Sequence, residues 1–84
     1  MKKVHRNSEL QRDGFFLFAL AHTSEPGRYL AHRLESAGET YLGVVWKVRD
    51  TAPPLWRREG STKLYPTRLK AANSLYREVV AKAP

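Results

Sequence analysis

The chain has 84 residues, a net charge of +7, a pI near 10.2 and 42% hydrophobic residues, which together predict one small folded domain. It contains no cysteine, which excludes disulfides and thiolate metal sites and fits a cytoplasmic location. No apolar run approaches the ~20 residues of a membrane-spanning helix, so we expect no contact with a membrane.

Residues 1–13 are polar and basic, and they show no sustained hydrophobic period. We therefore predict a flexible N-terminal arm over 1–13 and a single domain over 14–84. Lys2, Lys3 and Arg6 in the arm would add contacts to a negatively charged partner.

Residues 15–22 (FFLFALAH) form a short apolar run between Gly14 and a turn-rich segment at 23–27. This pattern favours a central strand. Residues 28–36 alternate between two faces, and 37–39 close a hairpin. One face of this second strand carries Leu30, His32 and Leu34, and the other carries Tyr29, Ala31 and Arg33.

Residues 40–49 (TYLGVVWKVR) show the clearest alternation in the chain, which predicts a third strand. We expect one face to pack in the core and the other to face solvent. The predicted core side carries Leu42, Val44, Trp46 and Val48, and the predicted outer side carries Tyr41, Val45, Lys47 and Arg49.

Residues 50–54 (DTAPP) interrupt the sheet because proline cannot donate to a strand ladder. Residues 55–58 and 62–65 then read as two short arms, which could form a hairpin or an irregular sheet edge. Trp56 either fills the gap between this loop and a helix or stacks on a ligand, and we favour the first interpretation.

Residues 67–82 are predicted to be helical, with Pro66 or Thr67 at the start. The 3.6-residue spacing gives the helix one apolar face. That face carries Leu69, Ala72, Leu75, Tyr76, Val79 and Ala83. The predicted fold is therefore α+β: an antiparallel sheet of three to four strands with one C-terminal helix packed on one face. The other sheet face would be left exposed.

The sequence gives no sign of catalysis, because it lacks a glycine-rich phosphate loop and a plausible nucleophile with its base. Its three histidines are too scattered to bind a metal. We expect no enzymatic activity, no metal and no cofactor.

Segment 45–70 concentrates seven Lys or Arg residues against only Asp50 and Glu59. A basic sheet face with aromatic residues is typical of nucleic-acid binding, and we favour DNA over RNA. The predicted binding residues are Lys47, Arg49, Arg57, Arg58, Lys63, Arg33, Tyr41 and Trp56.

There are two alternatives to nucleic-acid binding. A protein-interaction module could bind an acidic partner surface with Tyr, Trp and Arg anchors. The size and expected architecture are also similar to those of small phage-encoded inhibitors of host defence proteins. A homodimer could instead form by strand pairing at an exposed sheet edge.

Residues 63–79 (KLYPTRLKAANSLYREV) resemble the sheet-to-helix junction in the arm-site-binding N-terminal domains of phage-type tyrosine integrases. Tyr65-Pro66-Thr67-Arg68 and the following alanines stand at the positions that carry the likeness. The resemblance implies a three-stranded sheet in the DNA major groove with a helix behind it. It would make Lys47, Arg49, Arg57, Arg58 and Lys63 the DNA-facing group. The break at 50–54 departs from the tight hairpin of that family.

Overall fold

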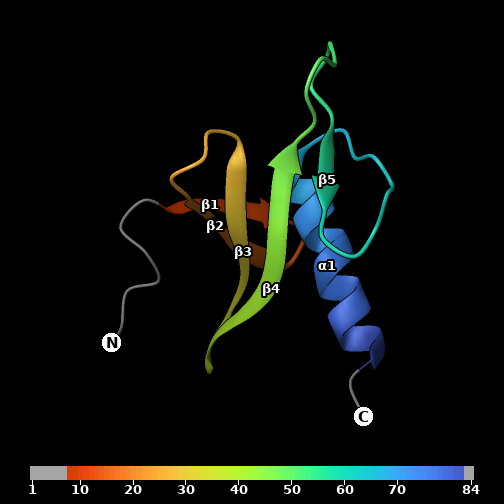
Figure 1. Cartoon of the computed structure of the whole chain (residues 1–84). Helices are drawn as coiled ribbons and strands as arrows, with labels where there is room; N and C mark the ends of the chain where they lie inside the picture. Colours follow the sequence, from red (N-terminus) through yellow and green to blue (C-terminus); the bar gives the residue numbers. More distant parts are fainter. Residues whose placement is uncertain (1–7, 83–84) are drawn as a thin grey trace.

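The computed structural model describes residues 8–82, which fold into a five-stranded antiparallel sheet with one helix (Figure 1). Each strand pairs with the next along the chain, in the order β1-β2-β3-β4-β5. The α+β class is confirmed, but the sheet has five strands instead of three to four. No helix within 8–82 is long and apolar enough to cross a membrane. The elements are β1 (Ser8–Asp13), β2 (Phe16–His22), β3 (Arg28–Glu35), β4 (Gly38–Lys47), β5 (Trp56–Arg58) and α1 (Arg68–Lys82).

The additional strand is β1, which occupies residues expected to belong to the N-terminal arm. It pairs with β2 along its whole length, from Ser8 opposite Ala21 to Asp13 opposite Phe16. Lys2, Lys3 and Arg6 lie outside the described residues. At the other edge β5 has three residues, and the expected arm at 62–65 contributes a bridge between Trp56 and Tyr65.

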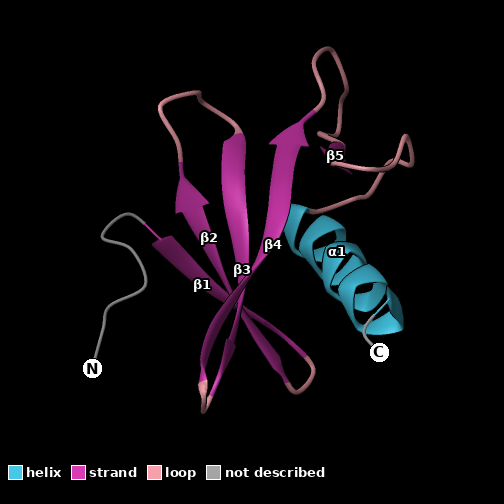
Figure 2. Cartoon of the chain, turned by 60° about the horizontal axis from the view of Figure 1, so that its bottom comes forward, coloured by secondary structure: helices cyan, strands magenta, loops and turns pink. Residues whose placement is uncertain are grey.

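Helix α1 packs on one face of the sheet, chiefly against β4 and β5. Figure 2 shows that the sheet is strongly twisted, so strands distant from β4 also reach the helix. The rings of Phe18 on β2 and Tyr76 on α1, for example, lie 6.0 Å apart. The buried core comprises Phe18, Leu20, Tyr29, Ala31, Leu42, Val45, Trp56, Ala71, Ala72 and Leu75.

The start of α1 follows the prediction. The amide of Lys70 donates to the Thr67 hydroxyl at 3.1 Å, so threonine caps the helix. Trp56 is 8% exposed and belongs to the core, which confirms the packing interpretation of this residue.

The two faces of β4 are reversed from residue 44 onward. Tyr41 lies opposite His32 and Gly43 opposite Ala31, so Leu42 is one residue more than β3 can match. This β-bulge shifts the alternation by one residue. Val45 is consequently fully buried beneath α1, whereas Trp46 lies on the other face of the sheet. The predictions that Trp46 packs under the helix and that Val45 points outward are both wrong.

Residues on β3 and α1 also lie differently from the prediction. Tyr29 was assigned to the outer face but is 8% exposed beneath the helix, because it pairs with Val45. On α1, Ala71 and Ala72 are fully buried, while Val79 is 40% exposed despite its predicted place in the core. The helix therefore presents its small residues to the sheet, which permits a close approach.

Candidate functional site

The sheet face that α1 leaves uncovered is apolar, which contradicts the prediction of a basic outer face. Cross-strand pairs define this face, because directly opposed residues point to the same side. The row across the sheet runs from Leu10 through Ala19 and His32 to Tyr41. We call it the open face; its partly buried or exposed apolar residues are Leu10, Leu17, Leu30, Leu34, Tyr41, Val44 and Trp46.

Exposure is greatest at the two ends of this row. Leu10 on the edge strand is 62% exposed and Tyr41 is 52% exposed. Between them His32 is buried, with its ring 5.3 Å from that of Tyr41 and its Nδ1 3.3 Å from the Glu39 carboxylate. These contacts hold the centre of the face in a fixed shape, as a preformed binding surface requires.

Arginines stand at the rim of the open face. Arg12 pairs with Leu17 at one end, while Arg28 and Arg57 flank Trp46 at the other. The Arg28 guanidinium lies 5.6 Å from the centre of the Trp46 ring. Glu39 also lies on this face but contacts His32, so the rim is positively charged overall.

Four of the predicted binding residues lie on the helix side of the sheet instead, and Lys47, which pairs with Trp56, is one of them. Arg58 is 9% exposed and donates to the Glu78 carboxylate of α1. The Arg33 guanidinium packs over the ring of Phe16 at 4.9 Å. Trp56 is in the core, so the eight predicted residues do not share one surface.

Lys47, Arg49 and Arg57 do come together, where β3 begins and β4 ends. With Arg28 and Trp46 they border a hollow of about 350 Å³, which we call the sheet-end hollow. Within residues 8–82 no carboxylate lies at ion-pair distance from any of the three. The Nε of Arg57 is also buried without a hydrogen-bond partner among the described residues. The sheet-end hollow therefore offers charge that the fold leaves uncompensated.

The acidic residue bordering this hollow is Glu25, which is already engaged. Its carboxylate lies 3.3 Å from the Arg28 guanidinium, in an exposed pair. Such a pair contributes little stability and is easily rearranged when a ligand approaches.

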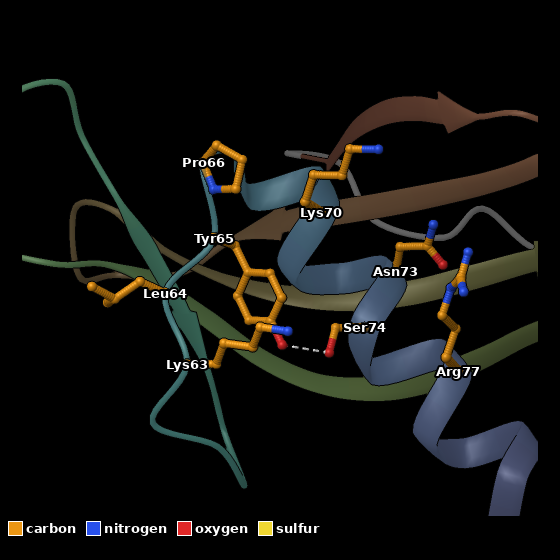
Figure 3. Close-up of a pocket in the computed structure, with 8 residues that line it drawn as sticks. All are labelled: Lys63, Leu64, Tyr65, Pro66, Lys70, Asn73, Ser74 and Arg77. Atoms are coloured by element: carbon orange, nitrogen blue, oxygen red, sulfur yellow. Dashed lines mark hydrogen bonds between the residues drawn. The ribbon is translucent and has the colours of Figure 1, made fainter.

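A second basic hollow, of about 440 Å³, lies between α1 and the segment that precedes it (Figure 3). We call it the helix-side hollow. Lys63 enters it from the loop, while Lys70 and Arg77 project from the helix. Lys70 lies 3.8 Å from Asp13, whereas Lys63 and Arg77 have no carboxylate at ion-pair distance among the described residues.

The floor of the helix-side hollow carries a tyrosine with an altered pKa. The Tyr65 hydroxyl lies 2.7 Å from that of Ser74, and this hydrogen bond lowers the pKa of Tyr65. Positive charge from Arg58 and Lys63 lowers it further, although burial opposes the shift. The same neighbours act on Arg58: burial tends to lower its pKa, but the hydrogen bonds with Tyr65 and Glu78 raise it overall.

Sequence reasoning missed Arg28 and the contribution of β1 to the open face. Arg28 shares no charge run with segment 45–70, and strand pairing alone brings it to Trp46. Gly43 could have indicated that the faces of β4 reverse. Glycine inside a strand often marks a β-bulge, and a bulge shifts the alternation of the residues that follow.

No group of three potential metal ligands occurs within residues 8–82. The chain matches no protein-family model, no curated protein and no solved structure. The resemblance to integrase arm-binding domains therefore stays a prediction.

Proposed function

We propose that the chain is a non-enzymatic protein-interaction module that binds a partner on the open face. The observation that supports this most directly is an uncovered sheet face with Leu10 and Tyr41 more than half exposed. Contiguous exposed apolar patches are uncommon on isolated domains and commonly mark binding surfaces. Phe15, in the turn between β1 and β2, adds a further aromatic ring that is 95% exposed.

The rim of the open face indicates the chemistry of the partner. An apolar centre with Arg12, Arg28 and Arg57 around it complements a protein surface with apolar anchors and surrounding carboxylates. A second copy is a poorer match, because each copy carries a net charge of +7 and the two would repel. We therefore favour an acidic partner over the homodimer.

The test uses variants that change the open face without touching the core. We would replace Leu10 and Tyr41 by Asp and immobilise this variant beside the parent chain. A Val80→Asp variant is the matched control, because Val80 is 53% exposed on α1, which packs on the opposite face of the sheet. The parent and control should retain one stoichiometric partner, with an acidic surface, from nuclease-treated lysate, and the open-face variant should lose it.

Equal retention by the open-face variant would show that the partner binds elsewhere. Retention by none of the three would remove the proposal. Sedimentation of the purified chain at several concentrations would detect the homodimer directly.

Nucleic-acid binding is a second candidate, and it now depends on the sheet-end hollow instead of the open face. Lys47, Arg49 and Arg57 lie there without carboxylate partners among the described residues, beside an aromatic ring. Such cations neutralise phosphates, and Trp46 could stack on a base. This candidate requires that affinity fall steeply with salt, and that Arg49→Ala and Arg57→Ala weaken binding to every sequence.

A further inference from the structure

A third hollow lies between the sheet-end hollow and the helix-side hollow. This middle hollow, of about 630 Å³, lies between the proline-rich loop after β4 and the start of α1. Lys47 and Gly27 border both the sheet-end and the middle hollow, and Pro66 borders both the middle and the helix-side hollow. Each hollow therefore lies next to the following one, and we call the series of three the path.

The path passes from one side of the sheet to the other. Trp46 and Arg57, at its beginning, lie on the face away from α1. Trp56 and Arg68, in the middle hollow, lie on the helix side, and Arg77 at its end projects from α1. A ligand that occupies the whole path must bend around the end of the sheet.

Free positive charge is present at both ends of this path. Lys47, Arg49 and Arg57 stand at the sheet end, and Lys63 and Arg77 at the helix side, none with a carboxylate at ion-pair distance within residues 8–82. In the middle, Arg68 binds Glu9 and packs over the buried rings of Tyr29 and Trp56. The middle is thus held rigid by the fold, while both ends retain cations for a ligand.

We infer that this path binds single-stranded nucleic acid, with phosphates at both ends and a base against Trp46. The inference rests on the nucleic-acid candidate and does not require protein binding to the open face, although Trp46 and Arg57 border both surfaces. Duplex DNA is stiff over about 150 base pairs and cannot bend around a sheet in a molecule 39 Å long. A flexible single strand can follow the path, and its unpaired bases are free to stack.

The test combines ligand length with variants at the two ends. Fluorescence anisotropy would measure binding of unstructured oligonucleotides of about 4 and about 16 nucleotides, as DNA and as RNA, and of the longer DNA as a duplex. The sheet-end variant is Arg49→Ala/Arg57→Ala, and the helix-side variant is Lys63→Ala/Arg77→Ala. The control, Arg12→Glu, removes the same net charge of two from an exposed site off the path.

The longer single strand should bind more tightly than the duplex. The helix-side variant should weaken the longer strand on the order of tenfold and leave the short one unchanged, while the sheet-end variant weakens both. Each double variant should reduce the slope of log affinity against log salt by about 1.4, since each phosphate contact contributes about 0.7. The control should preserve the difference between long and short strands. Comparison of the affinities for DNA and RNA oligonucleotides identifies the nucleic acid that the path prefers.

Three outcomes would overturn the inference. Tighter binding of the duplex would exclude a single-strand path. A helix-side variant that behaves like the parent with the longer strand would confine the ligand to the sheet-end hollow, and nucleic-acid binding would survive. Lack of salt-dependent binding to any oligonucleotide would remove the nucleic-acid candidate itself.

Discussion

The Glu59 carboxylate accepts a hydrogen bond from the amide of Val44 at 2.8 Å, and the Glu59 amide donates to the carbonyl of Val44 at 2.9 Å. This double contact holds the bulge in β4 and brings the Glu59 side chain against Gly43. A Cβ at Gly43 would lie 3.1 Å from the Glu59 carboxylate, and the φ of +148° there is rarely adopted by other residues. One glycine and one acidic side chain thus accommodate the bulge that sets which face of β4 meets the helix.

Gly43→Ala should therefore lower the free energy of unfolding by about 2–3 kcal/mol, through backbone strain and displacement of Glu59. Urea denaturation measures this loss. Gly38→Ala is the control, because Gly38 also has a positive φ, of +139°, but no atom near its Cβ position. Equal losses in the two variants would mean that the Glu59 contact contributes nothing.

Arg58→Met should destabilise the fold by about 2 kcal/mol, because it removes the buried end of the ion pair with Glu78. The figure is below that for fully buried pairs, since Glu78 is partly exposed and solvent screens it. Arg77→Met, at an exposed position of the same helix, should change stability by less than about 0.5 kcal/mol. Comparable losses for both would show that Arg58 acts only through the net charge.

Tyr65 should ionise at lower pH than Tyr41. The Ser74 hydrogen bond lowers the pKa of Tyr65, whereas burial and the charge of Glu59 raise the pKa of Tyr41. Tyrosinate absorbance in the parent, Tyr65→Phe and Tyr41→Phe chains would assign the two transitions. The reverse order would contradict the assignment.

The lowered pKa of Tyr65 also predicts how the stability of the fold depends on pH. A depressed pKa in the folded state favours the folded tyrosinate, so stability from Tyr65 is gained as the pH rises through its folded pKa toward 10.0. This contribution is fully present above pH 10.0 and lost as the pH falls through the folded pKa. The stability difference between the parent and Tyr65→Phe should therefore grow with pH in this window, and a difference independent of pH would count against it.

The open face should bind an apolar dye in the folded state. Leu10→Asp should reduce the fluorescence of 8-anilinonaphthalene-1-sulfonate with the native chain, yet change stability by less than about 0.5 kcal/mol, because Leu10 is 62% exposed. Leu20→Ala, in the core, should instead cost about 3 kcal/mol. Unchanged dye fluorescence in Leu10→Asp would show that the dye binds away from the open face.

The parts of the fold that the sequence predicts are those governed by local chemistry. Thr67 caps α1 as expected, because capping depends on residues three positions apart. The apolar run in β2 is a central strand, with neighbours on both sides. Trp56 packs in the core, as we favoured for an aromatic residue that can fill the gap between the loop and the helix.

The predictions that failed required information about distant residues. Strict alternation placed Leu42 and Trp46 on one face, but the bulge inserts a residue that only pairing with β3 reveals. β1 has Leu10 as its single large apolar residue, so its hydrophobic pattern is weak. The basic cluster was predicted from proximity in sequence, yet Arg28 joins it and Arg58 turns away because of strand pairing.

Side-chain hydrogen bonds connect β1, the first strand of the sheet, to α1. Glu9 binds Arg68 and Asp13 binds Asn73, across 59 and 60 positions of sequence. While the chain is being synthesised, Phe18, Leu20 and Val45 therefore have no cover until α1 has left the ribosome. The nascent sheet would display apolar residues on both sides during this interval. The yield of folded protein in cells should accordingly depend on how quickly α1 is synthesised and packs on the sheet. Chaperones that shield nascent chains should raise this yield.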